Sequence, residues 1–341
     1  MAERTGIQWT DHTHNPWSGC TKISAGCANC YAANLPPAMR RHAIWGDGGQ
    51  RVRATDAYLR QPFAWDRKAE KDGVRRRVFC ASVADVFEAR PELDPWREDL
   101  LKTIAATPHL DWQLLTKRPE YAVKFLAGRT LPPNLWMGTS VENQEAADIR
   151  IPHLLKIPAA VRFLSMEPLL GAVDVSRWLS VRPCACDAKG DVNPFRTCAE
   201  TPCAARVGWV IVGGESGPKA RPMHPDWARK LRDQCVAAGV PFFFKQWGML
   251  APGEEIDAAG NGWAGMYECD PRDGGVPRLY VHTDGQRGQD KSSVVDAQNG
   301  WAELLWVGKS AAGNMLDGRQ WAQFPDSTGN QQPLFGVPHA R

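Results

Sequence analysis

The sequence predicts an α/β protein: a partial (β/α) barrel of about 250 residues with a cysteine-rich insertion and an irregular C-terminal extension. Three observations predict this fold class. Short, strongly apolar runs recur along the chain, helix-like segments separate them, and polar residues follow each run. We place the barrel in residues 1–250, the insertion in 181–206, and the extension in the Gly-rich residues 251–341.

The apolar runs are rich in β-branched and aromatic residues, which is typical of parallel strands buried on both faces. Two segments between them, Asp94–Ala106 and Trp227–Ala238, carry apolar residues at helical spacing, and we expect Asp94 and Asp226 to be their N-caps. A third helix-like segment is Tyr31–Arg41. The predicted strands are Ile7–Thr10, Val78–Ser82, Trp112–Thr116, Leu135–Thr139, Val161–Ser165, Trp209–Val212 and Val240–Phe244.

Composition excludes several classes of protein. Hydrophobic residues make up 43% and charged residues 23% of the 341, which is globular usage rather than disorder. The longest apolar runs fall far short of the ~20 residues that a membrane span needs. The N-terminus also lacks the apolar stretch of a secretion signal. We therefore expect a cytoplasmic protein with no membrane partner.

The positive charge is concentrated in one segment. The net charge of the chain is only +3, but residues 40–77 hold 11 Lys and Arg against 5 Asp and Glu, and Arg75–Arg77 is the densest part. A solvated basic face and a patch that faces nucleic-acid phosphates both fit this excess.

Polar residues gather where the predicted strands end. Because active sites of parallel α/β barrels form at the carboxyl ends of the strands, this placement predicts an enzyme. Glu167, Glu215 and Lys245 are candidate acid/base groups, with ion pairing within the barrel mouth as the alternative. The other residues that follow predicted strands are Ser82, Asp85, Lys117, Arg118, Ser140, Glu142, Gly213 and Gly214.

Three cysteines stand close together after the first predicted strand. Cys20, Cys27 and Cys30 form a C-x6-C-x2-C motif, and clustered cysteines without a secretion signal indicate a metal site or catalysis. An iron–sulfur cluster held by three thiolates would leave one iron open to chelate S-adenosylmethionine (SAM). A structural zinc site is the alternative, and it needs a fourth ligand from His12, His14 or His42.

A second cysteine cluster lies in the insertion. Its C-x-C-x11-C-x4-C spacing in a loop with Pro and Gly fits a zinc knuckle of four thiolates. An auxiliary iron–sulfur cluster and uncoordinated thiols are the alternatives. The four residues are Cys184, Cys186, Cys198 and Cys203.

The opening segment IQWTDHTHNPWSGCTKISAGCANCYA resembles that of a radical-SAM-like family common in bacteriophages and prophages. So do, in chain order, LLTKRPE, GTSVEN, FLSMEPLLG, WVIVGGESGPKARPM, FFFKQWG and VGKSAAGNMLDGR. The resemblance covers nearly the whole chain except 181–206. It implies a radical SAM partial barrel with a 4Fe-4S cluster on Cys20, Cys27 and Cys30, SAM as cofactor, and an electron donor such as flavodoxin or ferredoxin.

The sequence departs from the usual radical SAM pattern. The first gap is longer than in the common C-x3-C-x2-C motif, and Asn29 stands where an aromatic residue is common. In the usual pattern, a Gly-Gly-Glu sequence follows the second strand, where the methionine end of the cofactor is held. Here Ser82 and Asp85 occupy that place, and Gly213-Gly214-Glu215 lies on a late strand. By strand order, the resemblance then implies Ser140 and Glu142 near the ribose and Gly213 and Gly214 near the adenine.

Members of the resembled family are implied to hypermodify thymine in phage DNA, which would protect viral DNA from host restriction. The implied reaction is an isomerisation of the 5-Nα-glycylthymidine to 5-Cα-glycylthymidine type. It suits a radical enzyme, because nitrogen and carboxylate flank the glycyl α-carbon from which hydrogen would be removed. A target base in duplex DNA would have to be flipped out. The alternatives are a radical SAM lyase or repair enzyme on modified pyrimidines, and a zinc-stabilised DNA-binding protein without catalysis.

Overall fold

The computed structural model describes residues 5–180, 197–198, 201–202, 205–258, 277–288 and 300–325. The chain forms two compact units, and each is described by itself. Unit 1 comprises residues 1–140, 148–165 and 181–206, and unit 2 comprises residues 141–147, 166–180 and 207–341. Among the described residues, no helix is long and apolar enough to cross a membrane.

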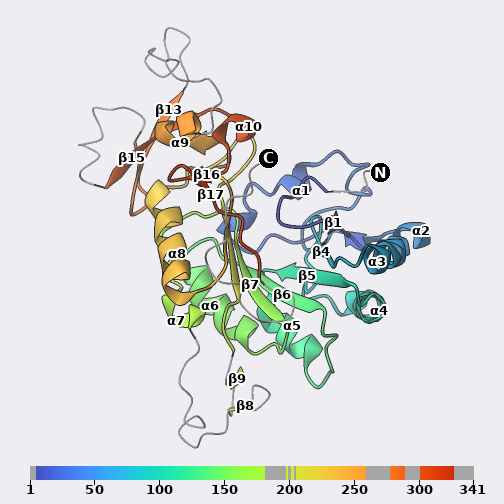
Figure 1. The fold of residues 1–341 in the computed structure, drawn as a ribbon. Helices are drawn as coiled ribbons and strands as arrows, with labels where there is room; N and C mark the ends of the chain where they lie inside the picture. Colours follow the sequence, from blue (N-terminus) through green and yellow to red (C-terminus); the bar gives the residue numbers. More distant parts are fainter. Residues whose placement is uncertain are drawn as a thin grey trace, which may run out of the picture. The chain divides into compact units, whose positions relative to one another are not determined.

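Unit 1 is built on parallel strands in the order β1-β4-β5-β6-β7 (Figure 1). Apolar side chains such as Val78, Leu114 and Phe163 are fully buried, as expected for parallel strands covered on both faces. The short strands β2 (Trp17–Ser18) and β3 (Val52–Arg53) form an antiparallel pair. In the sequence, β2 precedes the cysteine motif and β3 follows it. The sheet strands are β1 (His12–Thr13), β4 (Arg76–Cys80), β5 (Leu110–Thr116), β6 (Leu135–Ser140) and β7 (Val161–Met166).

Helices connect these strands, as the alternation in the sequence predicts. Helix α3 contacts both β4 and β5 (Figure 1). The short β8 (Thr197–Cys198) and β9 (Thr201–Pro202) fall in the insertion. The helices of this part of the chain are η1 (Ala25–Cys27), α1 (Tyr31–Asn34), α2 (Asp56–Leu59), α3 (Gln61–Asp72), η2 (Pro91–Leu93), α4 (Asp94–Ala105), α5 (Pro119–Leu126) and α6 (Gln144–Leu155).

Unit 2 contains a parallel pair, β10 (Trp209–Gly213) and β11 (Phe242–Gln246), joined by α8 (Pro225–Ala238). An antiparallel sheet in the order β12-β15-β13-β14 follows. Its strands are β12 (Leu250–Ala251), β13 (Arg278–His282), β14 (Arg287–Gly288) and β15 (Trp301–Trp306). The remaining elements are α7 (Ser176–Leu179), α9 (Gly253–Ala258), α10 (Lys309–Ala312), β16 (Met315–Leu316) and β17 (Arg319–Gln320).

The mixed α/β class with parallel strands is confirmed, and six predicted strands lie within two residues of observed ones. The expected first strand, Ile7–Thr10, is wrong. The Thr10 amide donates to the Ile7 carbonyl at 3.4 Å, so this segment closes a turn, and His12–Thr13 pairs with β4 instead. The expected irregular C-terminal extension is also corrected, because its described part contributes strands to an antiparallel sheet.

The helix ends differ from expectation for local reasons. Helix α1 ends at Asn34, because two prolines, Pro36 and Pro37, follow it closely. Asp94 is the first residue of α4 rather than its N-cap. At α8, the N-cap is His224, whose Nδ1 accepts a hydrogen bond from the Asp226 amide at 3.1 Å.

We predict that Gly138→Ala destabilises the protein. A Cβ at this position in β6 would lie 2.3 Å from the ring of Phe163, which is fully buried. Overpacking of this kind costs about 1–3 kcal/mol of unfolding free energy, which urea denaturation measures. Gly171→Ala is the matched control, because its Cβ would find its nearest neighbour at 3.8 Å. Equal stability of the two variants would contradict the prediction.

Candidate functional site

The cysteine motif forms a loop in unit 1 that follows β2. Cys20, Cys27 and Cys30 are free, partly buried thiols. Helix η1 ends at Cys27, and Cys30 is the N-cap of α1. Within the loop, Lys22 Nζ donates to the Ala28 carbonyl at 2.7 Å. One short, internally bonded loop therefore presents all three sulfurs.

The carboxylate of Asp85 joins this region to the sheet. It follows β4, is 6% exposed, and accepts four hydrogen bonds. Oδ1 accepts from the Phe87 amide at 3.0 Å and the Thr116 hydroxyl at 2.6 Å. Oδ2 accepts from the Lys117 amide at 3.0 Å and Arg118 Nη1 at 2.9 Å. Because protein donors engage both oxygens, Asp85 is a positioning residue in this arrangement.

Arg118 carries this connection to the cysteine loop. Its guanidinium is buried beside Asp85, and Nη2 donates to the Thr21 carbonyl at 2.8 Å. Nη1 also lies 3.9 Å from the Cys20 sulfur. The end of β5 thus places a permanent positive charge beside the first cysteine of the motif.

Ser82, the second predicted residue after β4, is also tied to the cysteine loop. Asn15 Oδ1 accepts from the Ser82 amide at 2.7 Å, and Asn15 Nδ2 donates to the Ser82 hydroxyl at 3.0 Å. The Tyr31 hydroxyl, next to the third cysteine, donates to the Ser82 carbonyl at 2.9 Å. The end of β4 is therefore fixed against Asn15, which precedes β2, and against Tyr31, which follows the third cysteine.

Lys117 links the loop to the end of β6. Its Nζ donates to the Ser140 hydroxyl at 3.1 Å. Burial alone would raise the pKa of the Cys27 thiol, but the Lys117 charge and hydrogen bonds from the amides of Ile23 and Ser24 lower it below its ordinary value. Lys117 therefore interacts with both Ser140, through a hydrogen bond, and Cys27, through its charge.

Cys20 differs from Cys27 in its electrostatics. Burial raises the pKa of Cys20 to about 12, and the carboxylate of Asp85 adds to this shift although Arg118 opposes it. At neutral pH the Cys20 thiol is therefore protonated unless a metal binds it, since thiolates, not thiols, are metal ligands.

The donor chemistry of the loop fits an iron–sulfur cluster, because three unbridged thiols lie on it. The fit is one of ligand type, because no group of three or more His, Cys, Asp or Glu side chains is gathered to hold a metal ion among the described residues. Of the candidate histidines, His14 is 1% exposed and stacks on Tyr58, and burial lowers its pKa to about 3. His12 stacks on Trp65, while His42 is exposed.

Unit 2 brings together two of the predicted acid/base groups. Glu167, directly after β7, forms an ion pair with Lys245 of β11, with 2.7 Å between Oε1 and Nζ. Both side chains are partly exposed. A Cβ on Gly213 would lie 2.9 Å from Glu167 Oε1, so the glycine leaves room for the carboxylate. Glu167 and Lys245 therefore form an accessible pair that could exchange protons.

The remaining predicted residues of unit 2 have structural roles in this arrangement. Glu215 is 6% exposed and binds the Arg221 guanidinium through two contacts, at 2.6 and 2.8 Å, and the Arg221 amide through a third, at 2.8 Å. This hydrogen bonding raises the pKa of Arg221 despite its burial, and the buried Glu142 contributes. A Cβ on Gly214 would lie 1.8 Å from the Trp247 carbonyl oxygen, so only glycine fits there.

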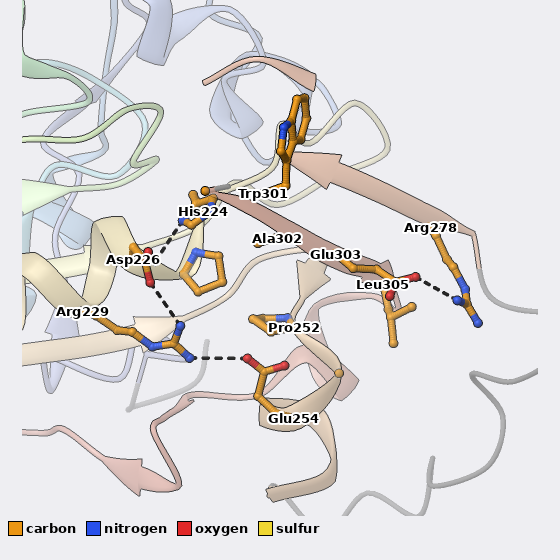
Figure 2. Close-up of a pocket in the computed structure, with 13 residues that line it drawn as sticks. His224, Asp226, Arg229, Pro252, Glu254, Arg278, Trp301, Ala302, Glu303 and Leu305 are labelled. Carbon is orange, nitrogen blue, oxygen red and sulfur yellow. Dashed lines mark hydrogen bonds and ion pairs between the residues drawn. The ribbon is translucent and has the colours of Figure 1, made fainter. Parts of the chain in front are cut away.

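A cavity of about 470 Å³ in unit 2 lies between α8, α9 and β15 (Figure 2). Figure 2 shows that its charged side chains face partners of opposite charge. Arg229 Nη2 lies 3.4 Å from Glu254 Oε1, and Arg278 Nη1 lies 2.8 Å from Glu303 Oε1. None of the predicted site residues lines this cavity, so it does not contribute to the candidate site.

Two further predictions concern other parts of the chain. Cys184, Cys186 and Cys203 lie outside the described residues, and only the backbone of Cys198, in β8, is described. The densest basic run, residues 75–77, is paired with carboxylates, which favours a structural role over a free phosphate-binding patch. The ion pairs are Arg75–Asp111 at 2.6 Å, Arg76–Asp72 at 3.3 Å and Arg77–Asp11 at 3.2 Å.

Sequence reasoning missed one buried ion pair beside the motif. Arg51 and Glu88 are 2% and 3% exposed and form two contacts, at 2.7 and 2.5 Å. Arg51 also donates to the Thr21 hydroxyl at 2.9 Å. The partners are 37 residues apart, so no local pattern could have revealed them, and Asn15 was missed for the same reason.

A protein-family model with the description "Protein of unknown function (DUF5131)" matches residues 4–325. No curated protein matches the chain, and no solved structure matches it. The matched span includes the cysteine loop and the Glu167–Lys245 pair.

We predict that Lys117→Ala slows alkylation of Cys27 by iodoacetamide in the metal-free protein at pH 8. Loss of the positive charge raises the pKa of Cys27, so less thiolate is present at that pH. Peptide mass spectrometry measures the rate, and Cys20 should react more slowly than Cys27 in both proteins. Lys124→Ala removes an equally charged, exposed residue of α5. An equal effect of this control would refute the assignment.

We predict that Asp85→Asn lowers the free energy of unfolding by about 3 kcal/mol, because it leaves the buried Arg118 charge without its carboxylate. Urea denaturation measures the change. Asp99→Asn is the control, because Asp99 pairs with Arg53 but is 49% exposed, and should cost less than about 1 kcal/mol. A similar loss in both variants would show that Asp85 has no special role.

Proposed function

The chain belongs to the family described as "Protein of unknown function (DUF5131)", and we propose that it is a radical SAM enzyme with a 4Fe-4S cluster on Cys20, Cys27 and Cys30. One observation carries the proposal: a single loop presents three free thiols beside the carboxyl ends of parallel strands. Active sites of parallel α/β folds form at these ends. Three thiolates, rather than four, leave one iron for a cofactor.

The cluster and SAM, when bound, would supply a radical that removes hydrogen from carbon. The protein's own groups prepare the site for them. Lys117 lowers the pKa of Cys27 and so favours the thiolate that binds iron. Arg118 places its charge beside Cys20, where it would offset the negative charge of a thiolate-bound cluster.

We assign positioning roles to the predicted cofactor-binding residues of unit 1. The Asp85 oxygens and the Ser82 hydroxyl are already bonded within the protein. We propose that they orient the loop, and that Ser140, held by Lys117, lies near the ribose. For Glu142, Gly213 and Gly214 of unit 2, the resemblance to the radical-SAM-like family implies contacts with the ribose and the adenine, and these assignments stay predictions.

We propose an isomerase that acts on an amino acid linked to the thymine methyl group in phage DNA. The bond from the methylene carbon to nitrogen breaks, a bond from the same carbon to the glycyl α-carbon forms, and one hydrogen moves from carbon to nitrogen. Substrate and product are isomers, so no net oxidant is needed. The Glu167–Lys245 pair is the proposed acid/base group for the amino nitrogen, whereas the Glu215 oxygens are engaged by Arg221. A flavodoxin or ferredoxin would donate the electron.

We predict that Cys27→Ala abolishes iron binding and the formation of 5′-deoxyadenosine from SAM while the chain stays folded. Anaerobically purified protein should carry about four irons and four sulfides at the motif. After dithionite reduction, chromatography measures 5′-deoxyadenosine, and circular dichroism checks the fold. Cys235→Ala, a buried thiol on α8, is the control that should keep its iron.

Two outcomes would overturn the proposal. Full activity in Cys27→Ala would exclude the motif as the cluster site. Zinc alone in the wild-type protein, with no cleavage of SAM, would favour the zinc-stabilised DNA-binding protein. If the radical chemistry is present, modified DNA containing 5-Nα-glycylthymidine separates the isomerase from a lyase or repair enzyme.

A further inference from the structure

A cavity of about 380 Å³ in unit 1 is lined by residues of β3, α2, α3 and α4. Its volume falls within the range of about 300–1,000 Å³ that is typical of small-ligand sites. None of the three cysteines lines it. The cavity is therefore a separate place where unit 1 could bind part of a ligand.

Part of the cavity lining is aromatic. It consists of His14, Phe63 and Trp96. Burial lowers the pKa of His14 to about 3, so its ring is uncharged at neutral pH. Phe63 and Trp96 are partly exposed, which leaves aromatic surface for a flat group to stack on.

Another part of the lining is cationic. It consists of Arg53, Arg60 and Lys102, against two carboxylates, those of Asp56 and Asp99. Arg53 pairs with Asp99 at 2.6 Å and also lies over the Trp96 ring, 5.9 Å from its centroid. Arg60 is exposed and has no ion pair in the part of the chain that the structure describes. Its guanidinium is available for an anion.

We propose that this cavity binds one nucleotide of single-stranded DNA, with the base against Phe63 and Trp96 and the phosphate against Arg60. Stacking surfaces combined with cations are the usual means of binding unpaired strands. An acidic peptide would use the cations but not the aromatic rings. The choice of DNA as the ligand rests on the proposed function. The volume and the lining of the cavity are observed independently of that function.

This proposal also identifies which basic residues of the segment 40–77 would contact DNA. Arg75–Arg77 are engaged by carboxylates, whereas Arg53 and Arg60, from the same segment, line the cavity. The contact with DNA would therefore depend on the residues near α2 and α3 rather than on the densest run of arginines.

The test is fluorescence anisotropy of a labelled oligo-dT strand with the full-length protein at several salt concentrations. Phe63→Ala should weaken binding about fivefold or more with little change in salt dependence, because it removes stacking. Arg60→Ala should reduce the slope of log K against log salt by about 0.7, because it removes one phosphate contact. Phe63→Leu, which keeps an apolar side chain, should also weaken binding if stacking is responsible.

Arg67→Ala is the matched control, since Arg67 is exposed on α3 but does not line the cavity. It should change the salt dependence less than Arg60→Ala does. Equal effects of the two variants, or unaltered binding in both Phe63 variants, would overturn the proposal. Competition by a polyglutamate peptide as effective as oligo-dT would show a site for acidic peptides instead, and would also overturn it.

The proposed radical SAM activity is tested by a different measurement, the formation of 5′-deoxyadenosine. A protein that forms no 5′-deoxyadenosine but binds oligo-dT through Phe63 and Arg60 would lose the radical chemistry and keep this site. A protein that cleaves SAM but binds oligo-dT independently of these residues would lose only the nucleotide site.

Discussion

The buried carboxylate of Asp85 is the interaction on which the arrangement of unit 1 depends. It fastens the segment after β4 to the end of β5 and, through Arg118, to the backbone of the cysteine loop. A buried charge is tolerated only when its partners are in place. The ends of β4 and β5 and the cysteine loop are therefore held by one set of mutually dependent contacts, and the environment of the three sulfurs is fixed by the sheet.

The two units hold chemically different groups. Unit 1 combines thiols with the basic side chains of Lys117 and Arg118, which suits an anionic metal centre. Unit 2 combines the carboxylate of Glu167 with the amine of Lys245, which suits proton transfer. In both units these side chains lie at or just after the ends of parallel strands. In unit 2, small residues are required at positions 213 and 214, because the Glu167 carboxylate and the Trp247 backbone approach the chain closely there.

Features with a local signal could be predicted from the sequence. The parallel strands were recognised because burial on both faces leaves a continuous apolar run, as in β5 and β6. The cysteine motif was recognised from its spacing. The position of the first strand could not be predicted, because Trp9 is an apolar residue that is buried without belonging to a strand. It lies in a turn and packs on Phe79, with 4.7 Å between the ring centroids.

Features that depend on distant partners could not be predicted. The sequence shows the charges of Arg75–Arg77 but not the carboxylates that engage them, which include Asp11 and Asp111. It shows Asp85 after a strand but not that Thr116 and Arg118, 31 and 33 residues later, occupy its oxygens. Ion pairs between separate segments have no periodicity, so only the folded chain distinguishes a positioning residue from one that is free to meet a ligand.

The division of the chain has a consequence for dissecting the protein genetically. The backbone passes between unit 1 and unit 2 five times, at residues 140, 147, 165, 180 and 206. No single truncation separates them, because a fragment that starts at residue 207 lacks the 141–147 and 166–180 segments of its own unit, including Glu167. Point substitutions within each unit, rather than deletion of either half, are therefore the way to ask what each unit contributes.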